Sequence, residues 1–315
     1  MELFVLSAIN GLIYGMLLFM LSSGLTLIFG IMGVLNFAHA SLYMLGAYFA
    51  FQIAQFTNFW VGLFVAPVLV GLVGAAIERY LLRRLHKYGH IPELLLTFGL
   101  FFLIEEVVKL VWGQPAVPYR VPALLHFTLF RLYNSSFAAY KLFMFVVAVL
   151  VFVALFLMLK RTRVGLIVQA SIGHPEMVTA LGHNVPLVFM GVFGVGAALA
   201  GLAGTIMGNF YVTEPSMAYH VGLIIFVIIV VGGLGSVTGA FIASIIIGLM
   251  DTLAVAFEYS LSDLLNVFHT QVSMSSPLYD FVHIKISDTA GVLPFLLMLV
   301  LLIFRPTGLM GQREV

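Results

Sequence analysis

The chain has 315 residues, a net charge of +1 and no cysteine, and 62% of its residues are hydrophobic. Only 9% are charged, against roughly 25% in an average soluble domain. This composition excludes a soluble globular protein and predicts a polytopic membrane protein in contact with lipid. It also argues against nucleic-acid binding, which needs a strong positive field, and it excludes disulfides and thiolate metal sites.

Nine membrane spans of about 20 residues each are predicted from the long apolar runs of the chain. In chain order they cover about 3–29, 34–55, 60–82, 94–112, 141–159, 187–211, 221–231, 240–256 and 291–304. The predicted fold is therefore an all-α, polytopic transmembrane helical bundle of about nine spans, in one domain that covers residues 1–315.

Glycine-rich breaks interrupt the apolar pattern at two places. The first, from Gly30 to Ser41, separates the first two spans, and the second, from Gly232 to Gly239, separates the seventh and the eighth. The order span, break, span thus occurs twice, and internal repeats with discontinuous helices are typical of transporters. Because irregular backbone at membrane depth is tolerated only inside protein or beside a water-filled cavity, we expect both breaks to lie on a translocation path.

The candidate path residues are polar or small side chains in and around the two breaks. They are Thr26, Asn36, His39, Ser41, Tyr43, Gly232, Gly233, Gly235 and Ser236. Two other interpretations stay open: His39 as a buried packing histidine, and Asn36 as the N-cap of the second span, since asparagine is a strong N-cap. The small residues at 196–208 are expected to pack against neighbouring helices.

Basic residues set the predicted orientation, because the cytoplasmic loops of membrane proteins are rich in lysine and arginine. Residues 79–87, residues 160–163 and the C-terminal tail hold nine of the fourteen lysines and arginines. All three regions fall on one side of a nine-span bundle, and we place that side and the C-terminus in the cytoplasm. The N-terminus and the long polar segment 257–288 are then expected to be periplasmic.

The loop at 160–186 is the polar interruption with the clearest internal pattern. Pro175 suits the first position of a helix, Glu176 places negative charge in its first turn, and Gly182 suits a left-handed cap. A helix of about two turns is too short to be stable alone in water, so we expect it to lie against a cytoplasmic partner. The apolar residues expected on the contacting face are Met177, Val178 and Leu181. The alternative is an amphipathic connector that lies on the lipid headgroups.

No motif in the sequence indicates an enzyme. The chain has no phosphate-binding Gly-x-x-x-x-Gly-Lys-Ser/Thr sequence, no metalloprotease helix and no histidines at metal-binding spacing. An ion-coupled carrier usually buries a carboxylate in mid-span. Here we expect Glu105, Glu106 and Asp251 to be interfacial or paired, for instance with Lys109. A path without its own ATP site or coupling carboxylate needs a partner that supplies energy.

Five stretches resemble the LivH-type permeases, which are membrane subunits of bacterial ABC importers for branched-chain amino acids. They are residues 24–48 (GLTLIFGIMGVLNFAHASLYMLGAY), 180–185 (ALGHNV), 196–204 (GAALAGLAG), 231–240 (VGGLGSVTGA) and 304–309 (FRPTGL). The resemblance implies an inner-membrane permease that works with a second, LivM-like permease subunit, two cytoplasmic ATPases and a periplasmic binding protein. The ATPases would bind ATP and Mg, and no cofactor is expected in this chain.

The resemblance also implies that residues 171–182 form a coupling helix that docks on an ATPase. The expected coupling residues are Gln169, His174, Pro175, Glu176, Met177, Val178, Leu181 and Gly182. Gln169 stands where the family usually has an arginine, which predicts a less ionic contact with the ATPase. The segment 257–288 is longer than the usual connection, and we expect it to touch the binding protein or the partner permease.

The predicted function is therefore that of a permease subunit that forms half of a translocation path. Substrates left open are branched-chain or other hydrophobic amino acids, urea, amides and aromatic acids, because no charged group that would grip a carboxylate or an amine is evident in the spans. The alternative is a stand-alone ion-coupled carrier or channel for small polar solutes. In that case Asp251 or Glu105 would be essential for uptake.

Overall fold

The computed structural model describes residues 2–133, 135–173, 175–257, 260, 262 and 282–311. Its α-helices are α1 (Glu2–Met32), α2 (His39–Phe56), α3 (Phe59–Ile77), α4 (Arg83–Leu85), α5 (His90–Trp112), α6 (Ala139–Arg161), α7 (Arg163–Gly173), α8 (Pro175–Ala180), α9 (Val185–Met207), α10 (Met217–Gly232), α11 (Val237–Ala256) and α14 (Leu293–Phe304). A π-helix, η1 (Glu78–Leu82), and three 3-10 helices, η2 (His86–Tyr88), η3 (Ala123–Leu125) and η4 (Ile286–Val292), also occur in the described residues. Two antiparallel strands, β1 (Thr128–Leu132) and β2 (Ser135–Ala138), form a hairpin.

The predicted all-α membrane bundle is confirmed, but the predicted number of spans is not. Six helical stretches of the described chain are long and apolar enough to cross a membrane. They are Glu2–Met32, Phe59–Tyr88, Ala139–Arg161, Val185–Met207, Val237–Ala256 and Ile286–Phe304. Helix α10 is apolar but has only 16 residues, whereas a straight span needs about 20.

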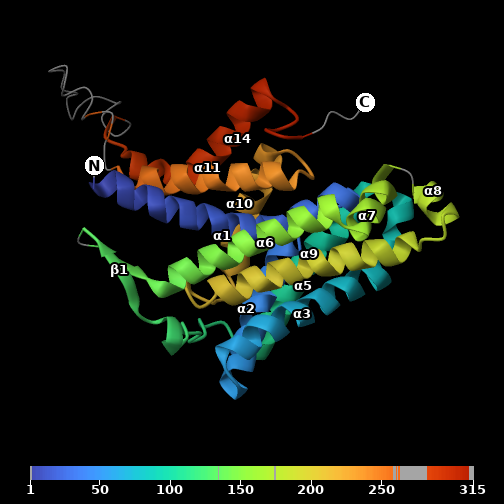
Figure 1. Ribbon diagram of the computed structural model, residues 1–315, viewed down its shortest axis with the longest axis horizontal. Coiled ribbons are helices and arrows are strands. Elements are labelled where there is room, and N and C mark those ends of the chain that lie inside the picture. Colours follow the sequence, from blue (N-terminus) through green and yellow to red (C-terminus); the bar gives the residue numbers. More distant parts are fainter. Residues whose placement is uncertain are drawn as a thin grey trace.

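The long helices run along the length of the molecule and pack through small residues (Figure 1). Helix α9 lies against α1, α2 and α3, and α1 packs along α11. A Cβ atom on Gly15 of α1 would lie 2.7 Å from the carbonyl oxygen of Ser244 on α11, and one on Gly204 of α9 would collide with the carbonyl oxygen of Tyr43. The prediction that the small residues at 196–208 serve helix packing is therefore confirmed.

Both glycine breaks are present, and they touch each other. After α1, Gly33 takes a φ of +66°, and after α10, Gly233 and Gly235 take φ values of +99° and +79°. A Cβ atom on Gly235 would lie 2.6 Å from the Cα atom of Gly30. The two segments that the sequence shows as a repeated pattern thus meet at one place in the bundle.

Three predicted boundaries are wrong. The second helix begins at His39 and not at about 34, because the left-handed Gly33 ends the first helix and 33–38 has no helical backbone. The helix after the second break resumes at Val237 and not at 240. The basic residues at 79–87, which were expected in a cytoplasmic loop, are in helix, since α3 continues through η1, α4 and η2 to Tyr88.

The C-terminal tail packs onto the end of α10. The backbone N–H groups of Leu309 and Met310 donate hydrogen bonds of 2.9 and 3.0 Å to the carbonyl oxygens of Val231 and Gly232. These carbonyls belong to the last turn of α10 and have no partner inside the helix. The end of the tail motif at 304–309 and the residue after it therefore supply hydrogen-bond donors to the carbonyl groups at the start of the second glycine break.

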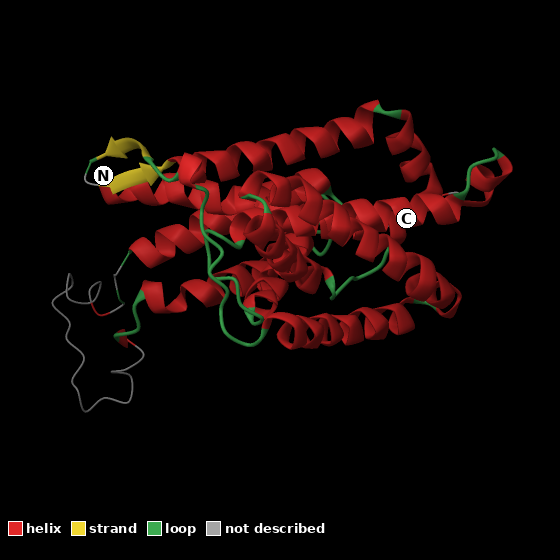
Figure 2. Ribbon diagram, turned by 90° about the horizontal axis from the view of Figure 1, so that it is seen from below, coloured by secondary structure: helices red, strands yellow, loops and turns green. Residues whose placement is uncertain are grey.

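The two ends of the bundle differ in what they carry (Figures 1 and 2). The N-terminus and the β1–β2 hairpin, which was not predicted, lie at one end. Helices α7 and α8 and the C-terminal tail lie toward the other. The predicted insertion 257–288 falls largely outside the described residues. In its described part, Ser260 pairs with Lys285 in an isolated antiparallel bridge.

Candidate functional site

A cavity of about 660 Å³ opens between helices that are distant in sequence. Tyr14 of α1, Tyr43 of α2, Met207 at the end of α9 and Phe295 of α14 are among its lining residues. A second cavity of about 390 Å³ adjoins it, since Tyr14, Tyr211 and Asp251 line both. These volumes lie within the range of roughly 300–1,000 Å³ that is common for small-molecule pockets.

The polar groups shared by the two cavities are two phenols and a carboxylate. Burial raises the pKa of Tyr211 above that of a free tyrosine, and the negative charge of Asp251 raises it further. The phenol therefore stays protonated and able to donate a hydrogen bond at neutral pH. Among the described residues the carboxylate of Asp251 forms no hydrogen bond or ion pair, although it lies within a helix of membrane-spanning length.

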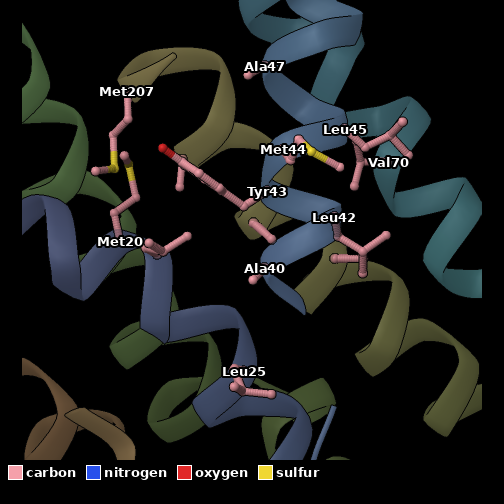
Figure 3. Close-up of a cluster of buried hydrophobic side chains, with 14 of the residues drawn as sticks. Met20, Leu25, Ala40, Leu42, Tyr43, Met44, Leu45, Ala47, Val70 and Met207 are labelled. Atoms are coloured by element: carbon pink, nitrogen blue, oxygen red, sulfur yellow. The ribbon is translucent and has the colours of Figure 1, made fainter. Parts of the chain in front are cut away.

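Tyr43 is the predicted path residue that lines a described cavity. Its side chain extends from α2 toward Met207 and Met20, across the apolar centre of the bundle (Figure 3). The ring is 2% exposed and lies in the main hydrophobic cluster. Tyr43 thus connects the cavity to the packed core between α1, α2 and α9.

Three other predicted path residues are buried and hydrogen-bonded within the protein. The hydroxyl of Thr26 donates to the carbonyl of Ser22, and that of Ser41 donates to the carbonyl of Phe101 at 3.0 Å. His39 Nε2 lies 3.0 Å from the carbonyl oxygen of Leu21, while Nδ1 has no partner. The hydrogen bond of Thr26 therefore lies within α1, those of His39 and Ser41 join α2 to neighbouring helices, and none of the three side chains lines a described cavity.

Asn36 does not cap the second helix, so that interpretation is wrong. The N-cap position is Ala38, which makes no side-chain capping bond. The side chain of Asn36 is fully buried, and neither its amide nitrogen nor its amide oxygen has a partner in the described part of the chain. A buried amide without partners is costly, yet Asn36 lines none of the cavities described above.

The predicted path residues at the second break lie under the C-terminal tail or at a helix start. Gly232 packs against Gly239 and Ala240, and its carbonyl oxygen accepts a hydrogen bond from the N–H of Met310 in the tail. Gly233 contacts the tail at Gly311, and Gly235 contacts Gly30. The Ser236 hydroxyl accepts a 3.1 Å hydrogen bond from the backbone N–H of Gly239 and so caps α11. The nine candidate residues thus do not share one cavity, although Gly30 joins the two breaks.

The predicted coupling segment has the start and the stop that the sequence indicates. Helix α8 begins at Pro175, and Gly182 has a φ of +86°. The N–H of His183 bonds to the carbonyl of Val178, and that of Gly182 bonds to the carbonyl of Thr179. This pair of bonds is a Schellman cap, in which a left-handed glycine satisfies the last carbonyls of a helix.

The apolar residues of α8 and Leu181, which directly follows it, do not all share one face, and this corrects the prediction. Val178 is 3% exposed, whereas Met177 and Leu181 are 65% and 78% exposed. Residues four apart lie on the same side of a helix, so Met177 and Leu181 form an uncovered apolar pair. Val178 instead holds α8 against the rest of the chain.

The remaining coupling residues have different surroundings. Glu176 is exposed in the first turn of α8. The side-chain amide of Gln169 donates a 3.0 Å hydrogen bond to the carbonyl of Leu159 and so ties α7 to the end of α6. His174 lies outside the described residues.

An ionic cluster fixes the chain just after α8. The guanidinium of Arg83 pairs with Glu78 at 2.8 Å and donates a 2.7 Å hydrogen bond to the carbonyl oxygen of Pro186. His86 pairs with Glu93 of α5. Because Glu78 is fully buried, this cluster anchors the start of α9 to α3 and α5. The described residues contain no group of His, Asp and Glu that would hold a metal ion.

Comparison with known proteins decides the family. The family model described as "Branched-chain amino acid transport system / permease component" matches residues 7–302. The chain belongs to this permease family. No solved structure gave a significant match.

Curated relatives cover almost the whole permease. The chain is 27% identical to the high-affinity branched-chain amino acid transport system permease protein LivH of Escherichia coli K12, over 99% of this chain and 97% of the relative. It is 28% identical to the permease protein BraD of Pseudomonas aeruginosa, over 98% and 95%. A probable LivH of Methanocaldococcus jannaschii is 29% identical over 78% and 79%. These relatives are transport permeases and not enzymes, and the chain is a multi-pass membrane protein of the same kind.

Sequence reasoning missed the polar cavity of this permease. Lys141, Asn10 and Tyr14 were not among the candidates, and Asp251 was expected to be interfacial or paired. The sequence does show Asp251 and Lys141 in predicted apolar spans, where ionisable groups are rare, and this could have pointed to the cavity. Glu105, in contrast, pairs with Lys109 at 2.7 Å, as expected.

Proposed function

We propose that this chain is the membrane permease subunit of an ATP-driven importer and forms half of the path for hydrophobic amino acids. Its partners would be a second, LivM-like permease subunit, two cytoplasmic ATPases and a periplasmic binding protein. ATP and Mg would be bound by the ATPases, and no cofactor by this chain. The names of these relatives, which refer to branched-chain amino acid transport, support this substrate class.

The observation that carries the proposal is the uncovered apolar pair on α8. Met177 and Leu181 project from a short, well-capped helix at the end of the bundle that carries the C-terminal tail. Such a helix needs a surface to be stable, and Val178 supplies only one side of it. A cytoplasmic ATPase would cover the other side, with the C-terminus in the cytoplasm and the N-terminus in the periplasm of an inner membrane.

Force on α8 would reach the path through α9. The ionic cluster holds the start of α9 at Pro186, and α9 packs against α1, α2 and α3. Closure of the ATPase dimer would therefore move α8 and α9 together and shift the bundle between two states. Such a shift requires contacts that differ between the states, and we place these contacts at 171–182.

A second candidate function rests on Asp251. An unpaired carboxylate beside a cavity in a membrane helix is a feature of ion-coupled carriers. A stand-alone carrier would transport its solute with an ion gradient and without ATP. A stand-alone carrier would not explain why Met177 and Leu181 are exposed on one side of α8.

Purification of the tagged chain from its native membrane in mild detergent tests the proposal. We expect a cytoplasmic ATPase and a second permease to co-elute, identified by mass spectrometry, and neither to elute with an unrelated tagged membrane protein. If the chain elutes alone and drives uptake with an ion gradient and no ATP, the importer proposal is wrong.

A further inference from the structure

The cavity between α1, α6 and α11 holds one positive and one negative side chain. Lys141 is near the start of α6, and Asp251 is near the end of α11, and both line the 390 Å³ cavity. They are 110 residues apart in the sequence, so only the fold brings them to the same space. The start of α6 and the end of α11 lie toward the end of the bundle that carries the N-terminus and the hairpin (Figure 1).

The two charges are not paired with each other. The ammonium of Lys141 donates a 2.9 Å hydrogen bond to the side-chain oxygen of Asn10. Since a lysine ammonium has three donors, it keeps capacity for an anion. Asp251 has no hydrogen-bond or ion-pair partner among the described residues. An unpartnered carboxylate in a half-buried membrane position is costly, and a cationic ligand would offset that cost.

The rest of the cavity wall is suited to an apolar side chain. Ile13, Leu17, Phe210 and Val255 line the same cavity. The hydroxyl of Thr252, a further lining residue, is already bonded to the carbonyl of Gly248. A ligand bound here would thus meet an anion, a cation and a mainly apolar surface.

We propose that Asp251 and Lys141 bind the ammonium and the carboxylate of an amino-acid zwitterion with an apolar side chain. This inference rests on the proposed import function and assigns its solute site. A carboxylate accepts strong, charge-assisted hydrogen bonds from an ammonium, and a lysine donates them to a carboxylate. Urea and amides carry neither charge and aromatic acids carry only one, so the site would favour an amino acid over the other substrates.

The site would receive solute at the outer end of the path. The smaller cavity adjoins the larger one at Tyr14, Tyr211 and Asp251, which line both. The larger cavity reaches Tyr43 in the centre of the bundle. A zwitterion released by the binding protein would be held first between the charges and then pass toward Tyr43.

Three probes of similar shape test which charge each residue recognises. They are L-leucine, 3-methylbutylamine, which lacks the carboxylate, and 4-methylpentanoate, which lacks the ammonium. Apparent Kd values are measured from the ligand-dependent rise in the unfolding temperature of the importer complex, purified without its binding protein. The variants are Asp251→Asn and Lys141→Gln, and the control is Glu106→Gln, which removes an exposed carboxylate paired with Lys109.

Asp251→Asn is expected to weaken the binding of L-leucine and of 3-methylbutylamine by about 10- to 100-fold and to leave the Kd of 4-methylpentanoate unchanged. Lys141→Gln is expected to weaken L-leucine and 4-methylpentanoate and to spare 3-methylbutylamine. Glu106→Gln should change none of them. The assignment is overturned if either variant loses binding of all three probes, or if either variant binds all three probes as the unmodified complex does.

ATP-driven uptake of L-leucine by the same complex, reconstituted into vesicles and supplied with its binding protein, separates failure of the site from failure of the function. If the unmodified complex takes up L-leucine and both variants bind all probes normally, the site is wrong and the import function stands. If the unmodified complex takes up no L-leucine with ATP, the import function itself is wrong. If uptake by the unmodified complex needs a proton gradient and Asp251→Asn removes that need, Asp251 is a coupling carboxylate and not a ligand site.

Discussion

Replacing both Met177 and Leu181 with aspartate is expected to abolish ATP-driven uptake while the chain still inserts in the membrane. Both side chains are mostly exposed, so the two substitutions should change the free energy of unfolding little. Burial of two such side chains against an ATPase would contribute about 3 to 6 kcal/mol, which corresponds to a more than 100-fold change in association. Uptake in membrane vesicles and the amount of ATPase retained on the tagged chain both measure the effect.

Helix α7 provides the matched control for this prediction. Val164 and Leu166 are 58% and 65% exposed, and they lie outside the predicted coupling segment 171–182. The double variant Val164→Asp, Leu166→Asp should retain the ATPase. If α8 merely rests on lipid headgroups, the α7 and α8 variants should behave alike. Equal loss in both, or full uptake in the α8 variant, would contradict docking through Met177 and Leu181.

The substitution Gly204→Ala is expected to leave only a small fraction of the protein folded. A Cβ atom at this position would collide with the backbone carbonyl of Tyr43, and backbone cannot yield as a flexible side chain does. Over-packing of a tight contact typically costs about 1 to 3 kcal/mol. Here it would also separate α9 from α2 at the residue that lines the larger cavity. The fraction of monodisperse protein left after heating in detergent measures the loss.

Gly191→Ala is the control on the same helix. A Cβ atom at Gly191 would meet nothing within 4 Å, so this change should leave the unfolding temperature unchanged or raise it, because alanine favours helix more than glycine does. If Gly204→Ala is as stable as Gly191→Ala, the α2–α9 contact is looser than described here.

Local signals in the sequence predicted local structure well. Pro175 and Gly182 marked the start and the end of α8, because proline and a left-handed glycine each act within one turn of the chain. The small residues at 196–208 likewise indicated helix packing, since close approach of two backbones requires them. The class of the fold followed from composition and the long apolar runs.

Features that depend on distant segments were not predictable in the same way. Val178 was assigned to the docking face, but the position of α8 against the rest of the chain buries it. The tail at Leu309 and Met310 completes α10, which no periodicity indicates. Asp251 and Lys141 are far apart in the sequence, and nothing in it relates them to each other. Only the packing of α1, α6 and α11 places them in one cavity.

The most direct test of docking of a cytoplasmic ATPase on α8 is a cross-link from position 181. The chain has no cysteine, so Leu181→Cys carries the chain's single thiol, to which a photoreactive group is attached in native membranes. Mass spectrometry of the adduct should identify a cytoplasmic ATPase, and Phe130→Cys on the hairpin at the opposite end should not capture it. An adduct with lipid only, or the same protein captured from both positions, would contradict an importer driven through α8.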